Sequence, residues 1–455
     1  PTVSVQTPND NDDLEPATQT LSGGSAGFVV RLLRAAPQSV EALATDMPLT
    51  FYQTPMLTVN TGTPVKLQAV APGETAVPGK AVGGAADPTG KTGSPLPATA
   101  GAFYSIRVNQ TDTYWNVTNT TPTITVATND QFDTEPSPAA LAAGTRLFSF
   151  TLQTATGGAS VSVWSDNPVI LATVTVSPIP VLANSASFLQ VLLPGETAEP
   201  GKLILPSGKF GAPSSQKSGE GFNVAVRSVD AWYNLISTDT RTVRLRSNDA
   251  HPSATVPVDQ PLLNGTIPFG MTVIISRSTT TFTATDLTGT PLISSGTSAN
   301  LLVRPGAASQ FEVVTSSFTD FSMQTSTLTA GTQYNLRLVA RDPFLNQDTD
   351  YIGTVKMESD DLTADLPNSP TNETLFIGAD QGRKEFIVPG GFTIKKAGAR
   401  YVRVYDVNAP TKTGLRNVTV NPGPPTKFIV QPSSPTYVTA GAGLIGGDPS
   451  YGTPF

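Results

Sequence analysis

Three consecutive stretches decide the fold: FNVAVRSVDAWYN (222–234), TVRLRSND (242–249) and FTATD (282–286). Within them apolar and polar residues alternate with a period of two, and β-branched and aromatic residues are abundant. This is the pattern of β-strands that bury one face. Turn-forming residues interrupt such strands every 8–12 residues or so, which is the spacing expected of a β-sandwich. No segment of the chain has a convincing helical pattern, so we predict an all-β protein.

The same motifs recur along the chain. Each FTATD-like strand closes with an aspartate, and these aspartates lie 120 residues apart, at Asp46, Asp166, Asp286 and Asp406. That period is too long for a solenoid turn of roughly 20–50 residues, and it suits a whole domain of about 100–150 residues. Two further landmarks repeat in the same order. An Asp-Xaa3-Asn motif occurs at Asp112/Asn116, Asp230/Asn234 and Asp342/Asn346, and Pro-Gly-Glu-Thr occurs at 72–75 and 194–197.

The repeats predict a string of sandwich domains. We expect complete repeats at residues 60–177, 178–304 and 305–421, the C-terminal half of a repeat at 1–59, and the N-terminal part of another at 422–455. The joints carry Pro-Gly breaks, and because proline fixes φ, such joints are semi-rigid and favour an extended rod. Within the third repeat we expect six side chains to point inward: Val224, Val226, Val243, Leu245, Val273 and Phe282.

The incomplete ends allow two interpretations. The chain is either a window cut from a longer repeat protein, or its end completes the start of a second copy by strand addition. Both end fragments together still lack a counterpart of residues 335–353, so we favour the window.

Composition narrows the function. The 455 residues carry a formal charge of −7 with only 14% charged residues, which disfavours a nucleic-acid partner. The chain has no cysteine and one histidine, His251, so thiolate and imidazole chemistry have almost no material. No apolar run approaches the ~20 residues of a membrane span. We predict no enzyme, no catalytic residues and no resident cofactor.

The motifs follow a fixed order: Pro-Gly-Glu-Thr, Phe-Xaa-Val-Xaa-Val, Asp-Xaa3-Asn, Ser-Asn-Asp and Thr-Ala-Thr-Asp. This order resembles the tandem bacterial immunoglobulin-like repeats of giant surface proteins, and invasin/intimin-type domains are broader relatives. The pattern is fullest at 222–286, looser at 103–166, and looser again at 334–406, where Pro-Gly-Glu-Thr is missing. The resemblance implies tandem immunoglobulin-like sandwiches in an extracellular stalk, adhesin or filament component, with no catalytic residues to carry over.

Several residue groups are candidate sites. The acidic loops at 9–13, 129–133, 248–249 and 360–361 offer oxygen ligands for Ca²⁺, with Asp10 and Asp12 the best candidates, but none has the spacing of a dedicated calcium loop. The favoured interpretation is turn formation through side-chain hydrogen bonds to the backbone. The Asp-Xaa3-Asn pairs recur in every repeat, which favours a structural loop clamp over an active site.

Three other groups were considered. Tyr114-Trp115 and Trp232-Tyr233 suit an aromatic platform for sugars, although packing in the core or between repeats is favoured. Lys80 and Lys202 are candidate donors for an isopeptide bond with asparagine, but both lie in Gly/Pro-rich loops rather than buried strands, which disfavours the bond. Sequons begin at Asn109, Asn116, Asn119, Asn264, Asn372 and Asn417, and composition alone accounts for them.

The sequence therefore predicts a structural extracellular repeat protein that forms a stalk, fibre, filament or sheath on or around a bacterial cell. We expect it to self-associate with neighbouring repeats or with copies of the same chain, as a homopolymer or fibre. The alternative is an adhesin or carbohydrate-binding surface stalk that uses Trp115 or Trp232.

Overall fold

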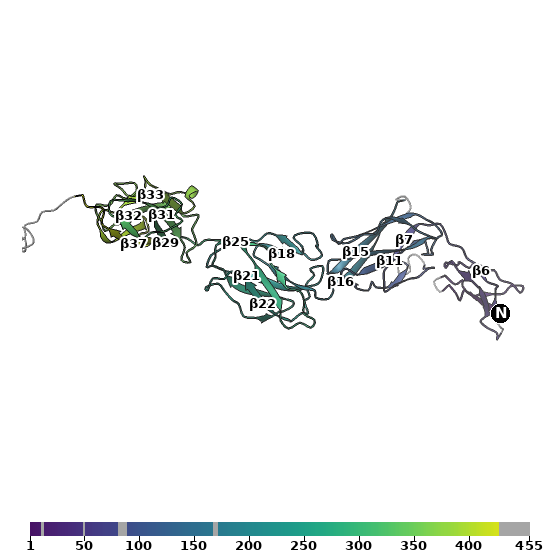
Figure 1. Ribbon diagram of the computed structural model, residues 1–455. Helices are drawn as coiled ribbons and strands as arrows, with labels where there is room; N and C mark the ends of the chain where they lie inside the picture. Colours follow the sequence, from purple (N-terminus) through teal and green to yellow (C-terminus); the bar gives the residue numbers. More distant parts are fainter. Residues whose placement is uncertain (11–12, 49–50, 81–88, 167–171, 427–455) are drawn as a thin grey trace, which may run out of the picture. The chain divides into compact units, whose positions relative to one another are not determined.

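The computed structural model describes residues 1–10, 13–48, 51–80, 89–166 and 172–426, and these residues form β-strands almost throughout (Figure 1). The described part of the chain contains one short 3-10 turn, η1 (Gly378–Asp380), and no α-helix. The predicted all-β class is confirmed. The predicted partial repeat at 422–455 lies outside the described residues from 427 onward.

The chain divides into two compact units. The first comprises Pro1–Ser215, Gly221–Thr272 and Ser278–Leu302, and the second comprises Gln216–Glu220, Val273–Arg277 and Val303–Phe455. Two short segments, 216–220 and 273–277, thus belong to the second unit although they lie before residue 303 in the chain. Below, the first repeat is the strands β1 to β6, the second β7 to β16, the third β17 to β28, and the fourth β29 to β37.

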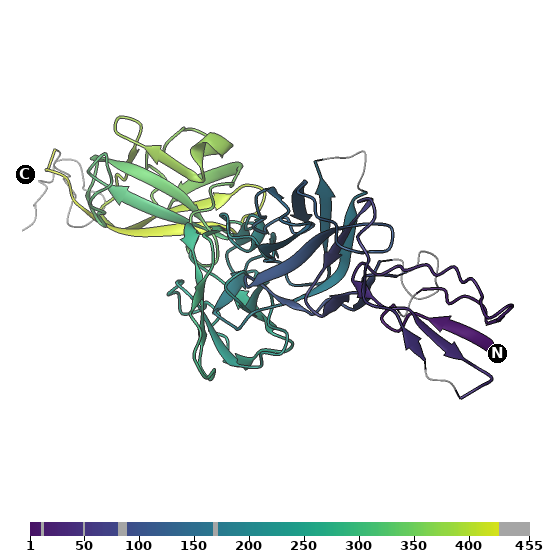
Figure 2. The same cartoon turned by 90° about the vertical axis from the view of Figure 1, so that its right-hand side faces the viewer.

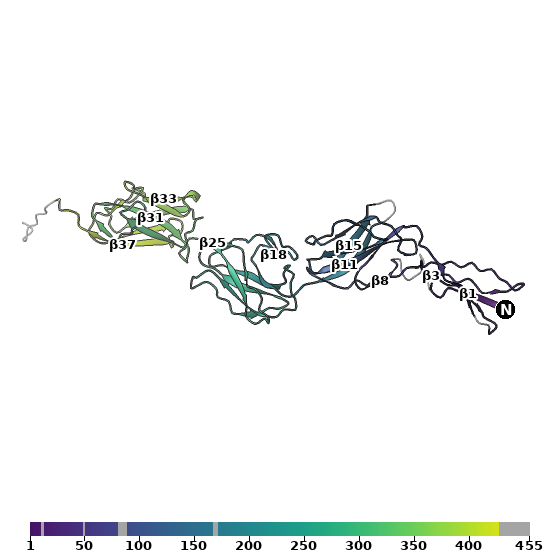
Figure 3. The same cartoon turned by 45° about the vertical axis from the view of Figure 1, so that its right-hand side comes forward.

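The second repeat is a sandwich of two sheets with immunoglobulin-like topology (Figure 3). One sheet has the order β14-β11-β7, formed by Thr145–Thr151, Phe103–Thr111 and Lys66–Val70. The other has the order β10-β16-β15-β12-β13, formed by Ala98–Thr99, Val174–Leu182, Thr156–Ser165, Thr123–Thr128 and Ala139–Ala140. The short strand β10 runs parallel to the last strand β16, and every other pairing is antiparallel. Between β7 and β10 in the chain, β8 (Glu74–Ala76) and β9 (Lys91–Gly93) form an antiparallel pair.

Alternation in the sequence places the core between these sheets. In β11 the buried residues Tyr104, Ile106 and Val108 alternate with more exposed neighbours, as the two-residue period of a strand requires. They pack with inward residues of the facing sheet such as Val161 and Val163 into one apolar cluster. Each fully buried side chain of this kind contributes roughly 1.5–3 kcal/mol.

The third repeat repeats this plan. Its strands are β17 (Phe188–Leu192), β18 (Glu196–Ala198), β19 (Lys209–Gly211), β20 (Gln216–Lys217), β21 (Gly221–Val229), β22 (Thr242–Ser247), β23 (Gln260–Pro261), β24 (Thr266–Thr272), β25 (Arg277–Thr280), β26 (Phe282–Asp286), β27 (Gly296–Thr297) and β28 (Leu301–Arg304). They form sheets of order β17-β21-β24, β23-β22-β26-β27 and β20-β28-β25, with the hairpin β18-β19. All six side chains predicted to point inward are fully buried, at 0% exposure.

The fourth repeat lies in the second unit, and Figure 2 shows its two layers in green to yellow. Its strands are β29 (Gln310–Ser316), β30 (Thr327–Thr329), β31 (Gln333–Arg341), β32 (Gly353–Ser359), β33 (Glu373–Phe376), β34 (Arg383–Phe386), β35 (Phe392–Thr393), β36 (Gly398–Asp406) and β37 (Thr413–Asn421). The sheets have the order β30-β37-β36-β32-β33 and β29-β31-β34, with β35 also paired to β31, and β30 again runs parallel to the last strand. Phe376, Phe392 and Met357 lie at the centre of its core.

Residues 1–59 contain six short strands: β1 (Thr2–Gln6), β2 (Gln19–Thr20), β3 (Pro37–Gln38), β4 (Glu41–Ala44), β5 (Tyr52–Gln53) and β6 (Leu57–Thr58). They form a sheet of order β2-β1-β4-β5 and the pair β3-β6. β1 pairs antiparallel with β4, as β12 pairs with β15 in the second repeat. The domain limits given above stay a prediction.

Candidate functional site at the repeat joint

Each Asp-Xaa3-Asn motif forms one tight loop directly after a long strand. In the second repeat, Asp112 Oδ1 accepts hydrogen bonds from the backbone N–H groups of Tyr114 and Asn116, at 2.8 and 3.0 Å. Aspartate is suited to this role because its short side chain reaches the backbone two residues further on. The residue before the asparagine has left-handed backbone geometry in all three copies, with φ of 66° at Trp115, 64° at Tyr233 and 69° at Leu345. Such a φ is costly for these residues, so the surrounding contacts must hold the loop in place.

The asparagine side chain reaches the preceding repeat. Asn116 Oδ1 accepts from the Ala35 N–H at 2.8 Å, and its Nδ2 donates to the Leu33 carbonyl, also at 2.8 Å. Both atoms of the amide are therefore satisfied by backbone groups two residues apart, as in a strand pairing. Asn116 is 3% exposed, so this polar contact is shielded from water.

The second copy has the same geometry. Asn234 Oδ1 accepts from the Ala155 N–H at 2.7 Å, and Nδ2 donates to the Gln153 carbonyl at 2.8 Å. The side chain of Asn234 also donates to both carboxylate oxygens of Asp230, at 2.9 and 3.2 Å. The loop and the joint thus share one buried polar network.

The third copy lies wholly within the second unit. Asn346 Oδ1 accepts from the Ser276 N–H at 2.9 Å, and Nδ2 donates to the Ile274 carbonyl at 2.8 Å. Nδ2 also contacts Ser218 Oγ at 2.9 Å. We call the three-residue segments that the asparagines bind, 33–35, 153–155 and 274–276, the docking segments.

The aspartate of each motif holds the linker that enters its repeat. The second carboxylate oxygen of Asp112 accepts from the Gly62 N–H at 2.8 Å, that of Asp230 from Asn184 at 2.8 Å, and that of Asp342 from Gly306 at 3.0 Å. One motif therefore fixes the incoming linker through its aspartate and the preceding repeat through its asparagine. The motif therefore clamps its own loop, as the sequence predicted, and also connects two repeats, which the sequence did not show.

Aspartates of the acidic loops hold the docking segments from within their own repeats. Asp10 Oδ2 accepts from the N–H groups of Leu33 and Arg34, at 2.6 and 2.8 Å. Asp130 accepts in the same way from the backbone of 153 and 154, at 2.6 and 2.7 Å, and Asp361 from that of 395 and 396, at 2.7 and 2.8 Å. Their partners lie 23 to 35 residues away in the sequence, whereas the predicted turns are local. Asp130 and Asp361 also bind their own turns, at the N–H groups of Phe132 and Thr363.

The charge on Asp361 is stabilised by these contacts. Burial raises the pKa of Asp361, but hydrogen bonds from Thr363 and from the backbone of 395 and 396 outweigh it and lower the pKa to about 2. The other acidic candidates are also partly accounted for. Asp360 pairs with Arg400 at 3.3 Å, whereas Asp12 lies outside the described residues. Among the described residues, no group of three or more acidic or histidine side chains is arranged to hold a metal ion, and calcium binding stays the alternative to the favoured turn-forming role.

The aromatic residues of the motif pack into the joint. The Trp232 ring lies over Gly101, where a Cβ atom would overlap the indole, and the Phe344 ring lies over Gly219 in the same manner. In the first joint the Tyr114 hydroxyl accepts from Arg31, whose guanidinium carbon lies 5.3 Å from the ring centroid. These contacts explain why the third residue of each motif is aromatic.

The proposed sugar platform does not have the exposure it needs. Trp115 is only 8% exposed, and the Lys66 ammonium lies 3.9 Å from the centre of its ring. Trp232 is half-buried, with its ring against Gly101. Both tryptophans are therefore used in packing.

The Pro-Gly-Glu-Thr motif builds a second polar contact in two of the repeats. Glu196 Oε2 accepts from the Leu193 N–H at 2.8 Å and pairs with Lys209 at 3.1 Å, and its side chain is 2% exposed. Glu74 and Lys91 form the equivalent pair at 2.8 Å in the second repeat. The hairpin then reaches the joint, because the Gly201 N–H donates to the Trp232 carbonyl at 2.7 Å.

Lys202 and the sequons have simpler roles. Lys202 Nζ pairs with Glu199 at 2.7 Å and donates to the Lys209 carbonyl at 2.9 Å, so no asparagine is its partner. Two sequon asparagines, Asn109 and Asn116, are buried at 3% exposure and cannot accept a glycan in this fold.

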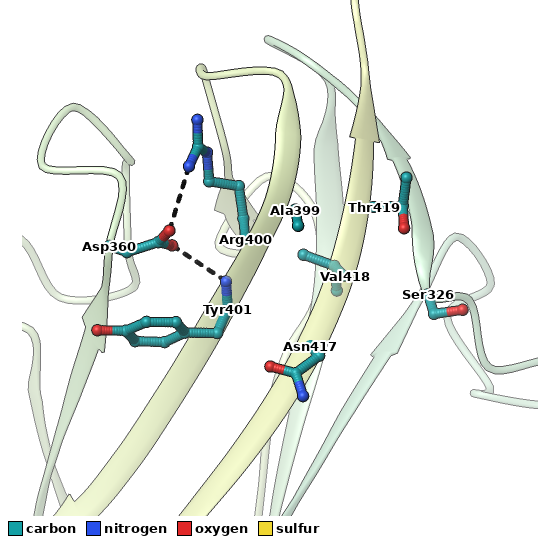
Figure 4. A pocket seen from close by; sticks show the side chains of 8 residues that line it. All are labelled: Ser326, Asp360, Ala399, Arg400, Tyr401, Asn417, Val418 and Thr419. Atoms are coloured by element: carbon teal, nitrogen blue, oxygen red, sulfur yellow. Dashed lines mark hydrogen bonds and ion pairs between the residues drawn. The ribbon is translucent and has the colours of Figure 1, made fainter.

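A pocket of about 420 Å³ lies on the fourth repeat (Figure 4). Asp360, Arg400, Tyr401 and Asn417 line it, and Asp360 binds both the Arg400 guanidinium and the Tyr401 N–H. Because its two charged side chains are paired with each other, the pocket offers no activated nucleophile or base. No helix among the described residues is long and apolar enough to cross a membrane.

Comparisons with known proteins find likeness at the level of structure only. No family model and no curated protein matches the chain. Solved structures that resemble it include FdeC, an Escherichia coli adhesin, with 14% identity over 79% of this chain and 99% of that one, at a TM-score of 0.30. Invasin, a bacterial integrin-binding protein, shows 13% identity over 92% and 72% of the two chains, at 0.26. The surface-layer protein SbsC shows 16% identity over 79% and 48%, at 0.17.

Proposed function

We propose that this chain of tandem immunoglobulin-like sandwiches is a structural part of a bacterial surface stalk or fibre and has no catalytic role. The observation that carries the proposal is the joint. Three equivalent asparagines, of which Asn116 and Asn234 are buried, bind the backbone of a docking segment that precedes their own repeat in the chain, with six hydrogen bonds of 2.7–2.9 Å. A chain that only linked independent binding domains would not need the same polar contact at each linker.

The repeated clamp supports a mechanical role. A hydrogen-bonded amide fixes both the distance and the direction between two backbones, whereas an apolar contact alone allows sliding. The repeats thus resist bending where a Gly/Ser linker would behave as a flexible coil. Few charges on the surface also favour lateral association, and we propose that copies of the chain associate into a fibre outside the cell.

Spin-label distances test the mechanical role directly. The chain has no cysteine, so Leu147→Cys (54% exposed) and Asn223→Cys can be labelled alone, one on the second repeat and one on the third. We expect a narrow distance distribution that broadens when Asn234 is replaced by alanine. A broad distribution in the otherwise unchanged chain would contradict a stalk with fixed joints.

Location and assembly need separate experiments. Protease treatment of intact cells that carry the protein should release its fragments if it lies outside the cell. Negative-stain images of the purified protein should then show ordered fibres of several strands. Isolated beaded strands at all concentrations would leave a stalk but exclude the homopolymer.

The alternative role as a carbohydrate-binding stalk loses its main support, because Trp115 and Trp232 are committed to packing. Binding on a glycan array that is lost on Trp232→Ala, while unfolding stability is kept, would restore it.

A further inference from the structure

The end of the fourth repeat contains the same docking groups as the three joints but lacks the loop that covers them. Asp361 holds the backbone at 395 and 396 as Asp130 holds it at 153 and 154. By this register, Lys395 and Ala397 correspond to Gln153 and Ala155. Segment 395–397 thus corresponds by register to the docking segments, although no asparagine binds it in the described part of the chain.

The two backbone groups that an asparagine would bind have no partner there. Among the described residues, no hydrogen bond involves the Lys395 carbonyl or the Ala397 N–H, and both residues are exposed. At the joints, the equivalent carbonyls and N–H groups all bind an asparagine amide. The fourth segment therefore has the geometry of a joint and lacks its amide.

The aromatic contact of the joint is also incomplete. Gly101, Gly219 and Gly331 follow the same parallel edge strand and have φ values of 75°, 79° and 82°. Each donates its N–H to an equivalent carbonyl, those of Leu152, Val273 and Ile394, at 2.8–2.9 Å. An aromatic ring covers the first two glycines, whereas an atom added to Gly331 would meet nothing within 4 Å.

The linker leaves the fourth repeat along the path seen at the earlier joint. The edge-strand residues Ala100 and Ala330 donate to the last residues of their partner strands, Leu182 and Asn421, both at 2.8 Å. Two residues after Leu182, Asn184 donates its N–H to the aspartate of the next motif. Gly423 stands two residues after Asn421, and its N–H has no partner among the described residues.

We propose that this face of the fourth repeat is the acceptor for the Asp-Xaa3-Asn loop of one further immunoglobulin-like repeat, joined through Gly423 in the same polypeptide. The asparagine would bind Lys395 and Ala397, the aromatic residue would cover Gly331, and the aspartate would take the Gly423 N–H. The known asparagines lie 83, 81 and 72 residues after the carbonyls they bind, so a counterpart for Lys395 falls beyond residue 455.

A second copy of the chain is the less suitable occupant. Its three Asp-Xaa3-Asn loops are already bound within their own chain, so it would have to break a joint to supply an amide. The proposal rests on the tandem-repeat stalk proposed above and adds the partner that its end accepts.

Hydrogen exchange measured by mass spectrometry tests the acceptor. In the chain as it is, segment 395–398 should exchange at least about tenfold faster than 153–156, which corresponds to about 1.4 kcal/mol. We then extend the chain by placing a second copy of residues 307–421 directly after Gly423. Gly423 thereby takes the place of Gly306, and the spacing from this glycine to the Asn346 of the added copy is the same as in the fourth repeat. Exchange of 395–398 and of 330–332 should then slow about tenfold.

The control is Asn346→Ala in the added copy alone, which should return 395–398 to fast exchange. Residues 330–332 should stay partly protected, because the Phe344 of the added copy still covers Gly331. Equal protection of 395–398 and 153–156 in the original chain, or no change on extension, would overturn the proposal. Protection that appears in the original chain only at high protein concentration would assign the face to a second copy instead. None of these outcomes depends on rigid joints or on cell location, so this proposal can fail while the stalk stands.

Discussion

Replacing Asn234 by alanine should uncouple the second and third repeats. The change removes the acceptor for the Ala155 N–H and the donors to the Gln153 carbonyl and the Asp230 carboxylate. A hydrogen bond lost from a buried site costs about 1–3 kcal/mol, and more when the partner is charged. Because Gln153 and Ala155 are only half-buried and water can replace part of the contact, we expect a total loss of about 3 kcal/mol.

The assay is urea unfolding followed by tryptophan fluorescence, since the Trp232 ring lies in the joint itself. In tandem repeats, stability is the sum of the stability of each repeat and the coupling between neighbours. The variant should therefore unfold with a lower midpoint, and the second and third repeats should unfold in separate transitions. Hydrogen exchange of 153–156 should become faster in native buffer.

Asn119→Ala is the matched control, because Asn119 is an exposed asparagine in the loop that follows the first motif. It should change stability by less than about 0.5 kcal/mol. Asn234→Asp sharpens the test, since it keeps the acceptor and replaces the donor with an oxygen that faces Asp230. Repulsion raises the pKa of the new carboxyl, so its instability should be greatest at neutral pH and lessen as pH falls and the group is protonated. A loss below about 1 kcal/mol on Asn234→Ala, with unchanged exchange of 153–156, would refute the clamp.

Three further predictions follow from other contacts. Gly101→Ala and Gly331→Ala both place a side chain at positive φ, but only the first drives a methyl group into an aromatic ring. In thermal unfolding, Gly101→Ala should therefore lower the free energy of unfolding by about 1–2 kcal/mol more than Gly331→Ala. Equal losses would mean that Trp232 does not pack on Gly101. Glu196→Gln breaks the buried pair with Lys209 and should lower the free energy of unfolding, measured by urea titration, by about 3 kcal/mol. Glu199→Gln, which breaks the more exposed pair with Lys202, should lower it by less than about 1 kcal/mol. Because the pKa of Asp361 is lowered to about 2 in the folded state, its stabilising contribution is fully present above about pH 4 and is lost as pH falls toward 2. Acid unfolding of Asp361→Asn should lack this part of the pH dependence, which is on the order of 1 kcal/mol.

Much of the fold could be predicted from the sequence because strand burial is written in a local pattern. Val224 and Val226, or Val243 and Leu245, are separated by one polar residue, and a two-residue period sends both to the same face. The repeated motifs predicted tandem sandwiches, and the all-β class was confirmed. The sequence indicated that Asp130 and Asp361 bind backbone N–H groups of their own turns, but not that Asp10, Asp130 and Asp361 also bind backbone more than 20 residues away.

The joint could not be predicted in the same way. The sequence did contain a signal. Gly101 and Gly219 occupy equivalent positions in the second and third repeats, and Trp232 and Phe344 occupy equivalent positions in the third and fourth. Yet the two members of a contact lie more than 100 residues apart, and nothing in the local pattern says which glycine an aromatic ring will cover. Trp115 is 8% exposed, in line with the packing that the sequence favoured, but the alternation rule for strands could not have shown this because its backbone has a positive φ.

By itself the sequence determined the repeated sandwich, the inward face of each strand and the absence of thiol chemistry, because these depend on residue identity and short-range periodicity. Only the tertiary structure decided what the Asp-Xaa3-Asn motif does. An asparagine amide can bind its own loop or a neighbouring backbone equally well, and the choice depends on which carbonyl and N–H the fold brings within 3 Å of it. That placement comes from the packing of whole repeats, which no local stretch of residues encodes.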